Sequence, residues 1–446
     1  MSLDAHHPII AIQSIELTSI TPALKVPFHP ELLLDIARKY GTPTYVYNQS
    51  VIQNRIRTLR SHLEGLPLDL YYAMKANHAV PVMQTILAEG LGIDAVSPAE
   101  LLFALEIGFA PENILFSANN MTDEEMHFAR SKGVTLNVGS LSRLKKLGQA
   151  YPGSEVCVRI NPQVGAGHHE HVITAGSKSK FGIPVEQMDE VHALVKAYNL
   201  KIKGLHQHIG SGILDTDTLW KAISVMLEVS MGFDNLSFIN VGGGLGVPYR
   251  PDERGIDMDQ FESKIVQPLS ACLRSHPSSN LKIWFEPGRF FTAESGILLA
   301  TVNTLKQTPH RTFAGMDSGM NHLIRPAMYD AYHEVVNLSN PSGERIPYDL
   351  VGNICESSDF FATSTCRDLL FHVHEHQFTP PQLGEMLARA ELTFLGFQFA
   401  NRSIPNRYAS AYPADTEQTN LDNWYAFERE NPNIFARCFV FWAQAI

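Results

Sequence analysis

Residues 68–97, LDLYYAMKANHAVPVMQTILAEGLGIDAVS, hold the pattern that decides the fold. An aromatic, apolar run at Leu68–Ala76 and a β-branched run at Ile93–Ser97 have the length and composition of strands. Between them, Ala79–Glu89 has the apolar spacing of an amphipathic helix. A helix between two strands carries the chain back along the sheet, so this stretch predicts a parallel βαβ unit.

The same alternation continues along the chain and predicts a barrel. The other strand candidates are Ile114–Ala118, Thr135–Ser140, Glu155–Ile160, Lys201–Gly210, Ser237–Gly246 and Lys282–Arg289. Helical patterns lie between them at Ala99–Ile107, Asp123–Ser131, Val185–Ala197, Thr216–Val229 and Met258–Arg274. Eight strands separated by helices favour a closed (β/α)8 barrel of the TIM type, with an open doubly wound sheet as the alternative. Chemically capable residues at the C-terminal strand ends, where a barrel builds its active site, favour the barrel further: Lys75, Asp94, Asn119, Asn161, His208, Gly242–Gly244 and Glu286.

Both ends of the chain predict a second domain rich in β-structure. Ile9–Leu24 and the region after Phe291 have the pattern of strands and turns, and the strand candidates are Ile297–Leu305, Arg311–Met316 and Tyr348–Ile354. We therefore expect a β-rich domain from residues 1–40 and 291–365, a barrel from residues 41–290, and a last segment, 366–446, of different character. Within that segment Pro380–Ala390 and Trp424–Glu430 are helical in pattern, whereas Phe399–Thr419 is polar and turn-rich.

The composition favours chemistry on small molecules. Hydrophobic residues make up 44% of the 446 residues and charged residues 18%, which is enough apolar content to bury a large core. The net charge of −11, without a basic block, disfavours binding to nucleic acid or to a membrane surface. Five cysteines without a CxxC pair predict a reducing cytoplasm rather than a disulfide framework. We expect neither a secretory signal nor a membrane span, because no apolar run approaches the ~20 residues that cross a bilayer.

Lys75 ends the first strand, in the stretch Tyr71-Tyr72-Ala73-Met74-Lys75-Ala76-Asn77. A lysine that is partly desolvated has a lowered pKa, which suits it to imine formation with an aldehyde cofactor. The structural alternative is a lysine that extends from the rim of the barrel into water.

A glycine run, NVGGGLG at Asn240–Gly246, follows a late strand. Consecutive glycines allow backbone N–H groups to surround an anion, and the late strands of barrels often carry phosphate sites. The run has neither the Gly-Lys-Ser/Thr end of a Walker A loop nor a dinucleotide fingerprint. A plain tight turn is the alternative.

The last strand ends in WFEPGR, at Trp284–Arg289, which puts a carboxylate and a guanidinium at its tip. A buried Glu286 requires a cationic partner, and a protonated pyridine nitrogen would be one. Arg289 could meet a phosphate or a carboxylate. The alternative is a structural ion pair between Glu286 and Arg289.

Two further groups of residues are weaker candidates. Cys355 follows an apolar strand beside Glu356 but has no neighbouring histidine, so a nucleophile is not indicated. It is either a proton donor or a thiol that only packs. We expect no metal site, because the histidines follow no fixed metal spacing: His168, His169, His171, His206, His208, His372, His374 and His376.

In combination, these motifs resemble those of the fold-type III decarboxylases that depend on pyridoxal 5'-phosphate (PLP), most closely the diaminopimelate branch. The resemblance runs from about Thr42 to Asp359 and rests on Tyr72–Asn77, Arg159–Pro162, Ser179–Gly182, His206–Ser211, Gly242–Gly244, Glu286–Arg289, Asp317–His333 and Cys355–Ser357. The Cys-Glu-Ser triplet and Arg325–Tyr329 favour that branch, since ornithine-type relatives have Cys-Asp at the triplet. The resemblance implies a TIM-like barrel with a β-rich second domain, as in alanine racemase and ornithine decarboxylase. It also implies a homodimer with active sites at the interface.

The resemblance further implies a role for each matched residue. Lys75 would form a Schiff base with PLP, His208 would stack on the pyridine ring, and Cys355 would return a proton to the substrate. The cofactor would be held by Lys75, His208, Ser211, Gly242, Gly243, Gly244, Glu286, Gly288 and Arg289. The substrate would be held by Arg289, Arg325, Tyr329, Glu356 and Ser357. The implied reaction is the decarboxylation of meso-2,6-diaminopimelate to L-lysine and carbon dioxide.

The likeness ends beyond Asp359. A Gly-Ala-Tyr segment, whose tyrosine touches phosphate and substrate in the family, is not found here, and Tyr408–Tyr412 is no convincing substitute. Two other functions therefore stay open: a catalytically impaired relative that acts as a binding or regulatory subunit, and a decarboxylase of lysine or ornithine. The retention of Lys75, His208, Glu286 and Cys355 favours an active enzyme.

Overall fold

The computed structural model describes residues 9–13, 28–165, 174–177, 179–250, 252–329, 331–340, 347–353, 379–398, 403–431 and 440–445. These residues belong to two compact units, Met1–Phe360 and Phe361–Ile446. No helix among them is both long enough and apolar enough to cross a membrane.

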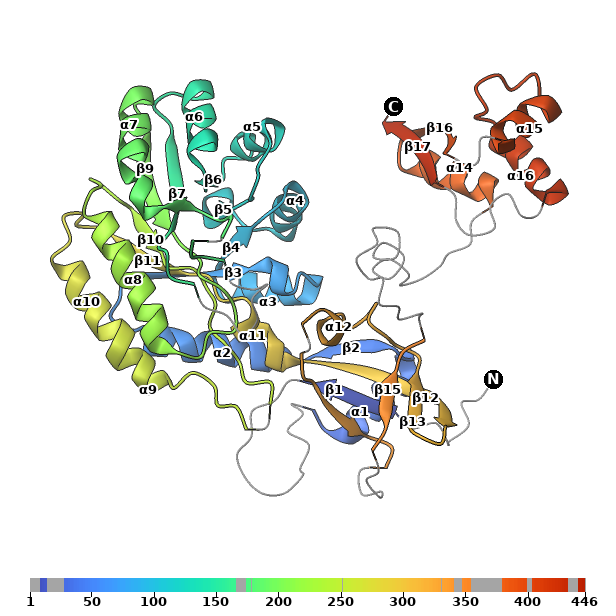
Figure 1. Cartoon of the computed structure of the whole chain (residues 1–446), viewed down its shortest axis with the longest axis horizontal. Coiled ribbons are helices and arrows are strands. Elements are labelled where there is room, and N and C mark those ends of the chain that lie inside the picture. Colours follow the sequence, from blue (N-terminus) through green and yellow to red (C-terminus); the bar gives the residue numbers. More distant parts are fainter. Residues whose placement is uncertain are drawn as a thin grey trace. The chain divides into compact units, whose positions relative to one another are not determined.

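The first unit contains a closed barrel of eight parallel strands (Figure 1). The strands are β3 (Leu68–Ala73), β4 (Gly92–Ala95), β5 (Ile114–Phe116), β6 (Thr135–Val138), β7 (Glu155–Asn161), β9 (Lys201–His206), β10 (Phe238–Asn240) and β11 (Lys282–Phe285). The barrel closes because β11 pairs with β3 and β6 pairs with β7. A short strand, β8 (Ile183–Pro184), is added beside β7. The predicted barrel is confirmed, and the open sheet is wrong.

Helices alternate with these strands and cover the outside of the barrel (Figure 1). They are α2 (Gln49–His62), α3 (Val80–Ala88), α4 (Pro98–Ile107), α5 (Asp123–Ser131), α6 (Leu141–Ala150), α7 (Met188–Tyr198), α8 (Thr216–Ser230), α9 (Met258–Phe261) and α10 (Gln267–Arg274). Several begin at a side chain that accepts from a free backbone N–H group: Ser97 caps α4, Asp215 caps α8, and Thr122 forms a capping box with Glu125 on α5. Local sequence therefore sets where these helices start.

A layer of side chains fills the barrel below the C-terminal strand ends. It consists of Tyr71, Leu115, Cys157, Phe238 and Trp284. The rings of Phe238 and Trp284 stack with centroids 3.6 Å apart. Gly204 makes room for this stack, because a Cβ there would lie 2.2 Å from the Phe238 ring. The layer fills the middle of the barrel, and the site lies above it, at the C-terminal ends of the strands.

A mixed sheet forms the second domain of the first unit (Figure 1). Its strands are β1 (Ile9–Gln13), β2 (Thr44–Tyr47), β12 (Gly296–Gln307), β13 (Thr312–Met316), β14 (Glu334–Asn337) and β15 (Asp349–Val351). The order is β14-β1-β12-β13-β15, with β2 also paired to β12. Helix α1 (Pro30–Tyr40) buries Leu33 and Ala37 against Ile297 and Leu299 of β12. The predicted β-rich domain from both ends of the chain is confirmed.

The second unit is small and has its own aromatic core. It contains α14 (Pro380–Arg389), β16 (Leu392–Gln398), α15 (Ser403–Ala411), α16 (Leu421–Glu430) and β17 (Val440–Ala445), and β16 pairs antiparallel with β17. The predicted helices at 380–390 and 424–430 are confirmed. The stretch 399–419, predicted to be turn-rich, contains turns after residue 412, but its first half forms the unpredicted helix α15. Tyr408 on α15 is buried and stacks on Trp424 with ring centroids 3.7 Å apart, which stabilises this helix.

Candidate active site

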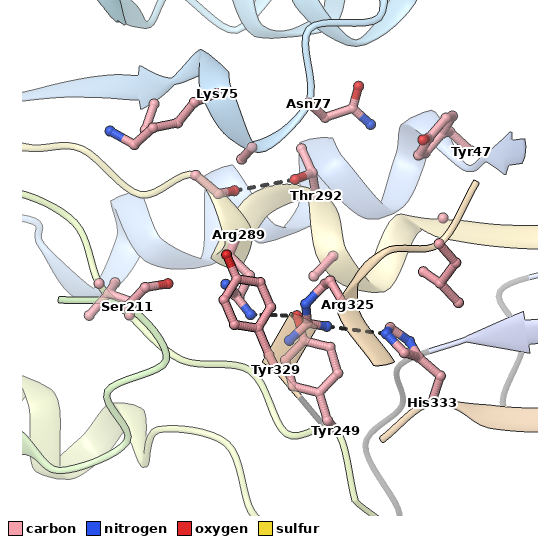
Figure 2. Close-up of a pocket in the computed structure, with 18 of the residues that line it drawn as sticks. Tyr47, Lys75, Asn77, Ser211, Tyr249, Arg289, Thr292, Arg325, Tyr329 and His333 are labelled. Carbon is pink, nitrogen blue, oxygen red and sulfur yellow. Dashed lines mark hydrogen bonds between the residues drawn. The ribbon is translucent and has the colours of Figure 1, made fainter. Parts of the chain in front are cut away.

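A cavity of about 600 Å³ lies at the C-terminal ends of the barrel strands. The barrel contributes Lys75, His208, Ser211 and Glu286 to its wall, and the sheet domain contributes residues that include Arg325 and His333. Figure 2 shows Lys75 and Ser211 on one side of this cavity and a group of arginines and tyrosines on another. The space is large enough for a ring-sized cofactor and a small substrate together.

Lys75 is held by a carboxylate from the next strand. It lies in a single 3-10 turn, Met74–Ala76, directly after β3, and its Nζ donates to Oδ2 of Asp94 at 3.0 Å. Asp94, at the end of β4, is buried. Burial by itself lowers the pKa of Lys75, but the charge and hydrogen bond of Asp94, with the charge of Glu286, raise it above its ordinary value. The expected lowering of the Lys75 pKa is therefore wrong.

Glu286 is a buried carboxylate with two donors from neighbouring strands. It follows β11 and is only 4% exposed. Nε2 of His206 lies 3.0 Å from Oε2, and Nδ2 of Asn240 donates to Oε1 at 2.5 Å. The alternative of an ion pair with Arg289 is wrong, since Nη1 of Arg289 donates instead to the hydroxyl of Tyr249 at 3.0 Å. The carboxylate is thus fixed in place at the base of the cavity.

His208 presents an uncharged imidazole to the cavity. The backbone N–H of Gly243 donates to its Nδ1 at 3.3 Å, which leaves the ring proton on Nε2. Burial, together with the positive charges of Lys75 and Arg159, lowers the pKa of His208 well below its ordinary value. A neutral, fixed ring of this kind can stack on an aromatic cofactor without repelling a protonated ring nitrogen.

The glycine run is required by packing and also borders the cavity. A Cβ at Gly243 would lie 2.2 Å from the carbonyl oxygen of Glu286, and one at Gly242 would lie 2.3 Å from that of Gln207. Gly242 and Gly244 also have positive φ angles of 75° and 94°. Gly244 and Ser211 line the cavity. The turn and the anion-binding interpretations are therefore compatible, because the tight turn brings backbone close to the space where a phosphate would lie.

Two arginines lie together on the far side of the cavity, around Tyr249 (Figure 2). The guanidinium of Arg325, on α12 (Arg325–Tyr329), lies 4.1 Å from the centre of the Tyr249 ring. Nη1 of Arg325 lies 3.3 Å from Nε2 of His333. Tyr329 also lines the cavity. Burial and the charges of Arg325 and Arg289 lower the pKa of His333 to about 4, so this histidine is neutral at physiological pH.

Three predicted site residues, Cys355, Glu356 and Ser357, lie outside the described residues. So do six of the histidines: His168, His169, His171, His372, His374 and His376. Within the described part of the chain, no group of three or more His, Cys, Asp or Glu side chains could hold a metal ion.

The sequence assigns no role to five contributors to the site: Asp94, His206, Asn240, Tyr249 and His333. Asp94 is predicted only to lie at a strand end, and His206 is only a metal candidate and a member of the motif His206–Ser211. Asn240, Tyr249 and His333 were not considered individually. Asn240 had a usable signal, because it is the last residue of a buried strand directly before the glycine run. Tyr249 and His333 had no such sequence signal, since their contacts with Arg289 and Arg325 depend on the folded structure.

A barrel with an amine, a neutral imidazole, a buried carboxylate and a glycine turn around one cavity defines the class of PLP-dependent barrel enzymes. The comparisons agree with that class. Residues 49–293 match the family model described as the pyridoxal-binding domain of pyridoxal-dependent decarboxylases. The C-terminal remainder is unmatched by this model.

Individual relatives narrow the class. The diaminopimelate decarboxylase of Methanothermobacter thermautotrophicus is 40% identical over 338 residues, which cover 74% of this chain and 79% of that protein. The structure of diaminopimelate decarboxylase from Helicobacter pylori complexed with L-lysine matches with 30% identity and a TM-score of 0.66, covering 74% of this chain and 82% of that one. A lysine/ornithine decarboxylase from Vibrio vulnificus, complexed with cadaverine, matches with 25% identity and a TM-score of 0.63, covering 77% and 87%. The chain belongs to the diaminopimelate decarboxylase family.

Proposed function

We propose that this protein decarboxylates meso-2,6-diaminopimelate to L-lysine and carbon dioxide, with PLP as cofactor. The observation that carries the substrate choice is the pair Arg289 and Arg325, which line the same cavity as Lys75. Within the described residues neither guanidinium forms an ion pair with a carboxylate. Diaminopimelate offers a distal carboxylate to such a pair, whereas lysine and ornithine offer only an ammonium group.

The residues around the cavity fit PLP. The amine of Lys75 would hold the aldehyde carbon, His208 would lie against the ring, and Glu286 would keep a proton on the ring nitrogen. Ser211, Gly242–Gly244 and Gly288 would surround the phosphate, whereas Arg289, which contacts Tyr249 beside Arg325, would face the substrate. The fixed orientation of Glu286 supports this assignment, because its two donors leave a buried anion that a protonated pyridine nitrogen complements. When bound, the cofactor supplies a ring that accepts the electron pair left on the α-carbon as carbon dioxide departs.

Side chains of the protein would then determine two proton positions: the proton on the ring nitrogen of the cofactor and the proton added to the α-carbon. Glu286, buried and acceptor-only when ionised, favours the protonated ring nitrogen. The Nζ of Lys75, held beside Asp94, is one donor for the α-carbon of the product. Cys355 is the other, and its role stays a prediction. Arg289, Arg325 and Tyr329 would orient the substrate.

The proposal is tested by the visible absorption of the purified protein and by carbon dioxide release from three substrates. We expect absorption from lysine-bound PLP and release from diaminopimelate at a rate far above that from lysine or ornithine. Lys75→Ala should abolish both signals while the protein stays folded by circular dichroism. Bound cofactor without release from any substrate would contradict the proposal and favour the alternative of an impaired, regulatory subunit. Preferred release from lysine or ornithine would assign the other substrate class.

We also propose that the protein is a homodimer, in which Cys355, Glu356 and Ser357 of one chain reach the cavity of the other. Membership of the family supports this arrangement. A location in the cytoplasm is supported by Cys157 and Cys272, which are both free thiols.

A further inference from the structure

We propose that Tyr249 and His333 are positioning residues that orient Arg289 and Arg325 without neutralising them, and so make the distal end of the cavity a receptor for a carboxylate. The inference deepens the proposed function, on which it rests for the identity of the substrate. Neither residue is a conspicuous motif in the sequence, and the geometry of their contacts carries the assignment.

Tyr249 contacts both arginines through different parts of its side chain. Its hydroxyl accepts from Nη1 of Arg289 at 3.0 Å, and its ring face lies 4.1 Å from the guanidinium carbon of Arg325. The ring of His333 packs edge-on to Tyr249 with centroids 5.8 Å apart. One tyrosine therefore fixes the separation of two cations that would otherwise repel each other.

His333 completes the arrangement as a neutral acceptor. Its Nε2 accepts from Nη1 of Arg325 at 3.3 Å. The ring is uncharged at physiological pH, because burial and the two nearby guanidinium groups lower its pKa to about 4. It therefore holds the direction of Arg325 by a hydrogen bond and adds no negative charge.

The choice of neutral partners decides what this part of the cavity can bind. A carboxylate beside Arg325 would hold it at least as firmly but would cancel its charge, and a second carboxylate, from the substrate, would then gain little. Here the acceptors are a phenol, an aromatic face and an imidazole. The Nε of Arg325 is buried without a hydrogen-bond partner in the described part of the chain. The two guanidinium groups keep their charge for a ligand.

The inference is tested with paired variants that separate hydrogen bonding from charge. His333→Gln keeps a neutral hydrogen-bond acceptor. His333→Glu has nearly the same shape as the glutamine variant but adds a negative charge. Tyr249→Phe removes the anchor of Arg289, and Tyr249→Leu also removes the ring under Arg325. Binding of pimelate, a seven-carbon dicarboxylate, to the PLP-loaded protein is measured by calorimetry, with heptanoate as the probe that lacks the second carboxylate. KM and kcat for diaminopimelate and lysine are measured in parallel.

We expect His333→Glu to weaken pimelate binding by roughly 10-fold or more and leave heptanoate binding nearly unchanged, while His333→Gln stays close to the wild type. Tyr249→Leu should weaken pimelate binding more than Tyr249→Phe. In turnover, KM for diaminopimelate should rise more than kcat falls, and the preference over lysine should shrink. His310→Glu is the matched control, because His310 is exposed and does not line the cavity.

The inference would be overturned if His333→Glu bound pimelate as tightly as the wild type, or if the Gln and Glu variants lost binding equally. Cofactor absorption and thermal unfolding show whether each variant is folded. If His333→Glu does not fold, the inference is decided by pimelate binding to Tyr249→Phe and Tyr249→Leu. Failure of the proposed function has a different signature. In that case the wild type would distinguish pimelate from heptanoate in the same way but would release no carbon dioxide from diaminopimelate.

Discussion

At the scale of single residues, the reactive amine depends on a carboxylate that the local sequence does not reveal. Asp94 is buried, and burial by itself raises its pKa. The charge of Lys75 and its hydrogen bond to Asp94 nevertheless lower the pKa of Asp94 below its ordinary value. Because the pKa of Asp94 is lower in the folded than in the unfolded state, its carboxylate stabilises the fold at pH values above the unfolded-state pKa. This stabilisation is lost as the pH falls through the folded-state pKa. Because the pKa of Lys75 is raised in the folded state, its ammonium group stabilises the fold at pH values below the unfolded-state pKa, and this stabilisation is lost as the pH rises through the folded-state pKa. Both side chains are therefore charged, and the ion pair is intact, at neutral pH.

Asp94→Asn should make Lys75 a faster nucleophile toward the cofactor. Without the carboxylate, burial lowers the pKa of Lys75, and a larger fraction of the amine is neutral near pH 7. We expect the protein stripped of cofactor to capture added PLP roughly 3- to 10-fold faster at that pH, with a smaller advantage in alkali. Stopped-flow absorption over a pH series measures this. Asp123→Asn, which breaks a surface ion pair with Lys146, is the control. An unchanged pH profile in Asp94→Asn would contradict the role.

At the scale of elements, the turn after β10 shows how strand packing and the site are linked. The Gly242–Gly244 backbone lies against the ends of β9 and β11, and the N–H of Glu286 donates to the carbonyl of Gly242 at 2.9 Å. The turn therefore fixes the start of the segment that carries the buried carboxylate. Any side chain at Gly243 must displace the backbone of Glu286.

Gly243→Ala should destabilise the barrel and weaken cofactor binding together. The added Cβ would lie 2.2 Å from the carbonyl oxygen of Glu286, which is backbone and cannot move away alone. We expect a loss of about 1–3 kcal/mol in the free energy of unfolding, as for an overpacked core, measured by urea denaturation. Gly139→Ala is the matched control, because its Cβ would meet its nearest neighbour at 3.5 Å, an ordinary contact. Equal stability of the two variants would contradict this account.

Elements that depend on local pattern were predicted well, and those that depend on distant contacts were not. The eight strands carry buried apolar runs, and the helices between them have amphipathic spacing, so periodicity alone locates them. Helix α15 was missed because its stretch is polar and rich in proline and asparagine. It is stabilised by Tyr408, which is buried by contacts that include Trp424 and Phe427 of α16. The hydrogen bond of Lys75 to Asp94 and the contacts of Tyr249 could not be predicted for the same reason. A position at a strand end predicts which residues lie near the site, but not which of their atoms are in contact.

At the scale of the whole molecule, the described part of the chain supplies a cavity with an amine, an imidazole and two arginines, but three predicted site residues are outside it. The family resemblance assigns Cys355, Glu356 and Ser357 to the partner subunit's cavity. If so, no single chain has a complete site, and activity requires assembly. The alternative is that Cys355 serves the cavity of its own chain. The two arrangements predict different behaviour when two inactive variants share a dimer.

Coexpression of Lys75→Ala with Cys355→Ala should restore activity if the sites are shared. Alone, Lys75→Ala lacks the amine that would hold the cofactor. Alone, Cys355→Ala should lose roughly 100-fold or more in kcat if the Cys355 thiol is the general acid. In a mixed dimer, one site contains both lesions and the other contains neither. Because random pairing makes half the dimers mixed, about a quarter of wild-type activity should return. Coexpression of Lys75→Ala with the double variant is the control, since every site then lacks the amine. No recovery in the first mixture, with mixed dimers confirmed by mass spectrometry, would place Cys355 in its own chain's site or remove it from the reaction.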